Sequence, residues 1–299
     1  MKKFNLLLLA TLVAFVALFF SCSKDSANSI ANPPVLSFNT SSNAFDTGDS
    51  VHLNIQINMG DNKINRVEVK EGTSYITDVN NLVWNGASAN SSAGFYNNTS
   101  NVVKDFVAIK PAAGTHVYTA IAYDKEGNAS TAQTITIVVG ALPEVANPNI
   151  FCTIAGGGTT STCASADGTV YDPAVANSAQ QLKIDFVYFS GNGTTPYGPA
   201  ASIYAPSAVP SGLSILFSNW TTKNATLLAK TNLSYASATF AQVYNEAKTL
   251  TTNSVSKLVA GDVVIFKTAS GKVGIFTVDL VSGTSNATDF ISISLATQS

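Results

Sequence analysis

The segment VHLNIQIN, residues 51–58, alternates apolar and polar side chains without a break. Val51, Leu53, Ile55 and Ile57 fall on one face of an extended chain, because successive side chains of a strand point to opposite sides. A period of two predicts a half-buried antiparallel strand and argues against a helix. This strand is the first indication that the first half of the chain is a β domain.

The same alternation recurs on the C-terminal side of this strand. Residues 124–130, DKEGNAS, contain Gly and Asn and predict a hairpin turn between two alternating segments. Several short strands at this spacing predict a β-sandwich over residues 35–140. The further strands are predicted at INRVEVKEG (64–72), VVKDFVAI (102–109), THVYTAIAYD (115–124) and AQTITIVV (132–139).

The stretch GTHVYTAIAYDKEGNASTAQTITIVV, residues 114–139, resembles the last hairpin of bacterial immunoglobulin-like (Ig-like) and PKD-like domains. Tyr118 matches the Tyr of the next-to-last strand in that family, and residues 124–128 match its Asp-x-x-Gly-Asn turn. The resemblance implies a spacer or an interaction module. A calcium site at this turn is the alternative, although turn hydrogen bonding explains the same residues without a metal.

The second half of the chain, residues 150–299, predicts a different domain. The segment QQLKIDFVYFSG, residues 180–191, ends apolar on both faces, which is typical of a covered central strand. GDVVIFKTASGKVGIFTV, residues 261–278, predicts two strands around a Ser-Gly turn, in which Gly271 suits a positive φ. DFISISLA, residues 289–296, alternates cleanly and predicts another strand.

One convincing helix is predicted in this second domain. Phe240, Val243, Tyr244 and Ala247 follow the i, i+3, i+4, i+7 spacing of a helix face, with Ser237 as the predicted N-cap. The chain is therefore predicted to be mainly β: an Ig-like β-sandwich followed by an α+β domain, in which one main helix packs on an antiparallel sheet. The polar, Pro-containing residues 141–149 are predicted to be the linker between them.

Three segments of the second domain, KIDFVYF (183–189), NWTTKNAT (219–226) and residues 261–278, resemble a recurrent domain of Bacteroidetes surface lipoproteins. This resemblance implies architecture and localisation, and it implies no particular activity.

The N-terminal residues predict export. Two lysines precede an apolar run, residues 4–20, whose length fits a signal-peptide core better than a transmembrane helix. FFSC (19–22) and CSKD (22–25) resemble the lipobox and the mature start of Bacteroidetes-type lipoproteins. The resemblance implies a signal peptide over 1–21, a lipid on Cys22 that anchors the protein to the membrane, and a tether over 22–34. The predicted localisation is an outer membrane lipoprotein, at the cell surface or on the periplasmic face; an ordinary secretion signal is the alternative.

The two remaining cysteines, Cys152 and Cys163, bracket a Gly/Thr-rich loop. Thiols oxidise in the compartment that an exported chain reaches, so a disulfide between them is predicted. Two cysteines without a nearby histidine are too few ligands for a metal site. No metal and no cofactor are expected.

Composition and charge exclude nucleic-acid binding. The chain has 16 Lys and Arg against 18 Asp and Glu, and Arg66 is its sole arginine, whereas phosphate recognition needs clustered Arg and Lys. His52 and His116 fall on strands of opposite predicted sheets and are interpreted as solvated surface residues, so no Ser-His catalysis is expected. Asp185, inside an apolar strand, is interpreted as half of a structural ion pair with Lys183 or Lys267, and a catalytic acid is the alternative.

Aromatic residues are the candidate ligand-binding residues. Tyr197, Tyr204 and Trp220 lie in or beside the Pro/Gly-rich residues 192–212, where they either stack on sugar rings or pack as the core of the loop itself. The same question applies to Trp84, Phe95 and Tyr96 in the first domain.

The predicted function is a non-enzymatic cell-envelope lipoprotein that binds an extracellular ligand, first of all a carbohydrate. An adhesion or assembly component with an envelope protein partner, in which the Ig-like domain is a spacer, is the alternative. A hydrolase is the third possibility.

Overall fold

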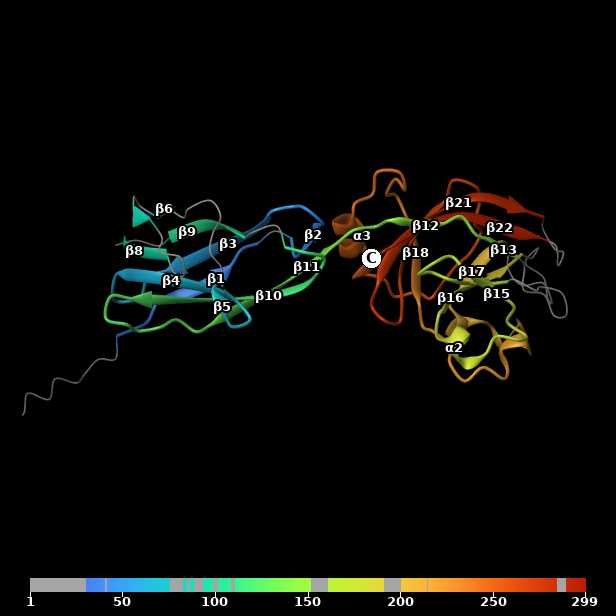
Figure 1. Cartoon of the computed structure of the whole chain (residues 1–299), viewed down its shortest axis with the longest axis horizontal. Coiled ribbons are helices and arrows are strands. Elements are labelled where there is room, and N and C mark those ends of the chain that lie inside the picture. Colours follow the sequence, from blue (N-terminus) through green and yellow to red (C-terminus); the bar gives the residue numbers. More distant parts are fainter. Residues whose placement is uncertain are drawn as a thin grey trace, which may run out of the picture.

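The structure is a computed structural model in which two β-rich domains follow one another along the long axis (Figure 1). The helix α3, Phe240–Ala247, lies between them. The structure describes residues 31–40, 42–75, 83–84, 87–88, 94–98, 102–108, 111–151, 161–190, 200–213, 215–283 and 289–299.

The first domain is built from two sheets. A three-stranded sheet has the order β1-β3-β9, and a six-stranded sheet has the order β2-β11-β10-β4-β5, with β8 also paired to β4. All of these pairs are antiparallel except β2 with β11. The strands are β1 (Val35–Phe38), β2 (Ala44–Asp46), β3 (Val51–Asn58), β4 (Ile64–Glu71), β5 (Ser74–Tyr75), β8 (Gly94–Asn98), β9 (Val102–Ala108), β10 (Gly114–Asp124) and β11 (Gln133–Gly140), beside the separate pair β6 (Val83–Trp84) and β7 (Ala87–Ser88).

The predicted alternation accounts for the core of this sandwich. Val51, Leu53, Ile55 and Ile57 are fully buried, and they pack with apolar residues of β4, β10 and β11. Tyr118, on β10, is also buried in this cluster. The hairpin predicted around residues 124–130 is present, because β10 and β11 pair in antiparallel register.

Asp124 holds the turn that follows β10. Its fully buried carboxylate accepts hydrogen bonds from the backbone N–H of Asn128 at 2.8 Å, from the Asn128 side-chain amide at 2.8 Å and from Asn62 at 3.0 Å. Burial acts to raise the pKa of Asp124, but these hydrogen bonds lower it more, to below its ordinary value. The Asp124 carboxylate, which a calcium site at this turn would use as a ligand, is thus hydrogen-bonded to amide groups.

The second domain has two further sheets, so its fold is mainly β with one main helix, as predicted. It differs from the prediction in having two antiparallel sheets instead of one. A six-stranded sheet has the order β12-β22-β21-β20-β18, with β13 also on β22, and a five-stranded sheet has the order β15-β14-β16-β17-β19. The elements are β12 (Glu144–Ala146), β13 (Asn149–Phe151), β14 (Thr162–Ala164), β15 (Val170–Tyr171), β16 (Ile184–Phe189), β17 (Ser202–Tyr204), β18 (Leu227–Thr231), β19 (Ser254–Val255), β20 (Val263–Lys267), β21 (Val273–Ser282), β22 (Phe290–Thr297), the short helix α2 (Ser178–Gln181) and the 3₁₀ turns η1 (Pro206–Ala208), η2 (Ser211–Leu213) and η3 (Ile215–Phe217).

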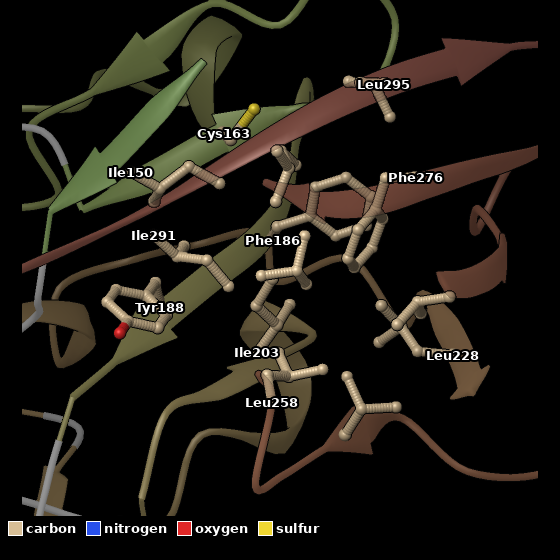
Figure 2. Packing of buried hydrophobic residues seen from close by; sticks show 14 of the residues in the cluster. Ile150, Cys163, Phe186, Tyr188, Ile203, Leu228, Leu258, Phe276, Ile291 and Leu295 are labelled. Carbon is tan, nitrogen blue, oxygen red and sulfur yellow. The ribbon is translucent and has the colours of Figure 1, made fainter. Parts of the chain in front are cut away.

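Strand β16 explains why a second sheet is needed. All six of its residues are buried, which confirms the predicted covered central strand. On one face Phe186 meets the ring of Phe276 edge-on, with centroids 5.6 Å apart (Figure 2). It meets the ring of Phe266 in the same way, with centroids 5.0 Å apart. On the other face Phe189 and its neighbours pack on the cluster that contains Phe217. A strand apolar on both faces requires a layer on each side.

The segment predicted to be a linker, residues 141–149, belongs to the second domain's sheet. It contains β12 and the first residue of β13, and both strands pair with β22. The backbone N–H of Thr297 also donates to the carbonyl of Pro143 at 3.3 Å. The prediction of a free polar linker is corrected by this pairing, because hydrogen bonds to a distant strand hold these residues in place.

The predicted helix is present as α3, but its N-cap is Thr239 and not Ser237. The Thr239 side chain accepts a hydrogen bond from the Gln242 N–H at 3.3 Å, and the Gln242 side chain accepts one from the Thr239 N–H at 3.0 Å. This reciprocal pair is a capping box, which outweighs the hydroxyl of Ser237 two residues earlier.

Helix α3 packs against both domains. Phe240, Val243 and Ala247 are buried on it, and they share one apolar cluster with the outer face of the six-stranded sheet and with two residues of the first domain. The sheet contributes Val273, Ile275, Ile265 and Ala296, and the first domain contributes Ala44 and Val138.

Phe240 is the central contact of this interface. A Cβ placed on Gly140, at the end of β11, would lie 2.8 Å from the Phe240 ring, so the ring packs directly on the backbone there. The Phe240 N–H donates to the carboxylate of Asp46 at 2.7 Å, and the Lys248 ammonium donates to the side chain of Asn43. The two domains therefore share a packed, hydrogen-bonded interface.

We predict that Phe240→Ala lowers the free energy of unfolding by about 3–5 kcal/mol, the usual range for deleting a buried Phe side chain. The variant should also become sensitive to proteolysis at residues 141–149, which we expect to resist cleavage in the unsubstituted protein because they pair with β22. Thermal melts and timed proteolysis measure both effects. Leu280→Ala, at a side chain that is 49% exposed, is the control and should change stability by less than about 0.5 kcal/mol. Equal melting temperatures for the two variants would contradict this description of the interface.

Candidate functional site

Several predicted site residues lie outside the described residues. These are Cys22, Cys152 and Tyr197. The side chains of Trp84, Phe95 and Tyr96 are likewise outside the description. The predicted lipidation and the predicted role of Tyr197 therefore stay predictions.

The disulfide predicted between Cys152 and Cys163 is not present in the structure, where Cys163 is a free and fully buried cysteine. Its thiol lies in the apolar core between the two sheets of the second domain, near Ile150 and Phe186 (Figure 2). Burial raises the pKa of the Cys163 thiol far above its ordinary value. The residue packs as a small apolar side chain.

Trp220 is a core residue. It is 8% exposed, its ring packs edge-on against Phe217 with centroids 4.9 Å apart, and its indole N–H donates to the carbonyl of Pro173 at 2.9 Å. Tyr204 is partly buried and packs edge-on against Phe189 at 5.6 Å. Both rings pack on the same apolar cluster of the segment, Trp220 as a buried member and Tyr204 as a partly buried one.

The two histidines do lie on opposite sheets, in β3 and β10. His52 is exposed, as predicted. His116 differs, because its Nδ1 lies 2.6 Å from the Glu71 carboxylate and its Nε2 lies 2.9 Å from the Ala112 carbonyl. Burial lowers the pKa of His116, but these two acceptors raise it more, to above its ordinary value. His116 is thus a structural partner of Glu71.

The described residues form a cleft of about 590 Å³ in the second domain. Its walls come from both sheets: the turn after β14, the start of β16, and the β20–β21 turn within the GDVVIFKTASGKVG motif. The lining residues are Ala164, Ser165, Ala166, Asp167, Leu182, Lys183, Asp185, Asn224, Thr268, Ala269, Ser270, Lys272 and Thr297.

Asp185 lies in the wall of the cleft and is 6% exposed. One carboxylate oxygen accepts hydrogen bonds from the Ser165 hydroxyl at 2.6 Å and the Ser165 N–H at 3.2 Å; the other accepts one from the Thr226 hydroxyl at 3.1 Å. Burial raises the pKa of Asp185 above its ordinary value, although these hydrogen bonds act to lower it.

The ion pair predicted for Asp185 with Lys183 or Lys267 is corrected by this geometry. The partners of the carboxylate are hydroxyls and a backbone amide, which reach it from neighbouring segments inside the domain. Lys183 is exposed, and the described residues give it no carboxylate partner.

Two further polar groups complete the cleft. Asn224 donates from its amide to the carbonyls of Leu182 and Ile184 at 2.9 and 2.8 Å, which ties its segment to the start of β16. The Thr297 hydroxyl donates to the Ser165 carbonyl at 2.5 Å and so joins β22 to the turn after β14. These bonds fix the cleft walls to one another.

No sequence pattern predicts this cleft. The hairpin around Gly271 is predicted only as a structural motif, and Asp185 only as half of an ion pair. Ser165, Asn224 and Thr297 lie in three separate segments, and no spacing pattern connects them. Only the pairing of the strands brings them together.

No protein-family model matches this chain, and no curated protein matches it. Among solved structures, the fibronectin(III)-like modules of CbhA from Clostridium thermocellum are similar to part of the chain. The sequence identity is 18% and the TM-score is 0.25, over 35% of this chain and 96% of that chain. The two sheets of the first domain, not this similarity, define it as a β-sandwich. Among the described residues, no helix is both long enough and apolar enough to cross a membrane.

We predict that Trp220→Ala lowers the free energy of unfolding by about 3–5 kcal/mol, because it removes a buried ring and leaves the Pro173 carbonyl without its donor. Thermal or denaturant unfolding measures the loss. Val175→Ala, at a nearby side chain that is 76% exposed, is the control and should stay within about 0.5 kcal/mol of the unsubstituted protein. A Trp220→Ala variant as stable as this control would contradict the core role of Trp220 and favour the ligand-binding interpretation.

Proposed function

We propose that this protein is a cell-envelope lipoprotein that binds a carbohydrate in the cleft of its second domain. The observation that supports the proposal is the cleft itself, which has a volume of about 590 Å³ and is lined from both sheets. Sites for small ligands are usually concave and about 300–1,000 Å³ in volume, so a small sugar fits this size.

The lining offers a sugar both polar groups and an apolar surface. Asp167, Asn224 and Ser270 offer groups that can bond to sugar hydroxyls, and none of the three is buried. Leu182, in the same lining, is 63% exposed and offers an apolar surface to the C–H face of a sugar ring. Tyr204 and Trp220, the rings predicted for this purpose, are not part of the lining.

The proposed anchoring places this cleft away from the membrane. The lipid on Cys22 and the tether over 22–34 come before the first domain, and the cleft lies in the second. Because α3 joins the two domains through a packed interface, the sandwich acts as a spacer of fixed orientation. This division of roles also fits the localisation at the outer membrane that the N-terminal residues predict.

The anchoring is tested with Cys22→Ala. The variant should lose acylation, because the thiol that carries the lipid is gone, and should be retained as a larger precursor by its uncleaved signal segment. Detergent partitioning and mass measured on envelope fractions report both changes. The control Ser23→Ala, one residue later, should be processed as before. Normal partitioning of Cys22→Ala would contradict the lipid anchor.

The binding role is tested with Ala269→Trp, which places a large ring on the exposed β20–β21 turn at the cleft. We expect the unsubstituted protein to bind at least one member of a panel of soluble oligosaccharides in calorimetric titrations. The bound oligosaccharide should keep its chain length, because the proposed role is binding without hydrolysis. Ala269→Trp should abolish that binding without lowering the melting temperature. The matched control is Ala113→Trp, on an exposed turn of the first domain, and it should bind like the unsubstituted protein. Binding that survives Ala269→Trp would place the ligand elsewhere.

A further inference from the structure

Two ammonium groups line the cleft, and neither has a carboxylate partner in the part of the chain that the structure describes. Lys183 comes from the residue before β16, and Lys272 comes from the turn that leads into β21. Lys183 and Lys272 form no ion pair with a described carboxylate, and the Lys272 ammonium donates to the Gln298 carbonyl at 3.4 Å. Two sheets thus bring one unpaired positive charge each to the same cleft.

The two carboxylates of the cleft do not compensate these charges by direct contact. Asp185 is occupied by Ser165 and Thr226, and its burial favours the neutral form of the acid. Asp167 is exposed, and one of its oxygens accepts the Thr169 N–H at 2.9 Å. The ammonium groups are therefore free to meet an anion that enters the cleft.

We propose that the ligand of this cleft is an acidic sugar, whose carboxylate or sulfate group is bound by Lys183 and Lys272. This inference rests on the proposed function, since it specifies the class of sugar that the same cleft takes. Hydrogen bonds between ammonium and carboxylate or sulfate are about twice as strong as neutral ones, which makes the acidic group the main anchor. The side-chain oxygen of Asn224, whose amide N–H groups bond to the cleft wall, and the Ser270 hydroxyl lie in the same lining for the hydroxyl groups of the ring.

The exposed lysines also make binding sensitive to salt. Charges at the surface attract an anionic ligand over distances of about 10 Å at 0.1 M salt, and this attraction weakens as salt rises. A neutral sugar of the same size gains nothing from it. The affinity of an acidic sugar should fall with added salt, whereas that of a neutral sugar should not.

The experiment compares three probes in calorimetric titrations with the full chain: tetragalacturonate, a sulfated galactose tetramer and the neutral galactose tetramer. At least one acidic probe should bind about tenfold or more tightly than the neutral tetramer, and a rise in NaCl should reduce this difference. Lys183→Met and Lys272→Met should each weaken binding of that probe by about tenfold, the usual effect of losing a charge-assisted hydrogen bond. Carboxylate and sulfate are distinguished by which of the two acidic probes shows the effect.

Lys223→Met is the matched control, because Lys223 is exposed, carries the same charge and lies outside the cleft lining. It should bind the acidic probe like the unsubstituted protein. If the neutral and acidic tetramers bind equally, and Ala269→Trp blocks both, the acidic-sugar inference is overturned while the proposed function stands. If the panel and these probes all fail to bind, both are overturned. If Lys223→Met weakens binding as much as the two cleft variants, overall charge explains the effect and the inference fails.

Discussion

The contact between the Phe240 ring and the backbone of Gly140 determines how the two domains are joined. A side chain at position 140 has no space, and the ring that fills it belongs to a helix packed on the other domain's sheet. The hydrogen bond from the Phe240 N–H to Asp46 adds direction to this packing. Apolar burial supplies the main stabilisation of this interface, and the carboxylate fixes the orientation of the helix.

This joint also places the cleft. Thr297 lines the cleft, and its N–H donates to the carbonyl of Pro143, in the segment by which the chain enters the second domain. The N–H of Ser299 donates to Ala141 in the same segment. The cleft therefore lies at the end of the second domain that faces the first. Because the interface between the domains is packed, the position of the cleft relative to the first domain is fixed.

The parts of the fold that local pattern determines could be predicted from the sequence. Alternation located β3 and the β10–β11 hairpin, and helical spacing located α3, because these depend on neighbouring residues. The linker prediction failed because the pairing of residues 144–146 with β22 depends on a strand far away in the sequence. The cleft could not be predicted for the same reason. The packing of Trp220 was left open because the Pro/Gly-rich sequence near it does not reveal which side chains cover the ring.

Strand β22 lies inside the six-stranded sheet, between β21 and the β12–β13 segment. Its Ile291, Ile293 and Leu295 are fully buried in the core. Yet it is synthesised after every strand with which it pairs, so the second domain cannot close its core while the earlier residues are being made. Such non-local pairing folds slowly. For a chain exported as proposed here, that delay keeps the second domain open until its translocation is nearly complete.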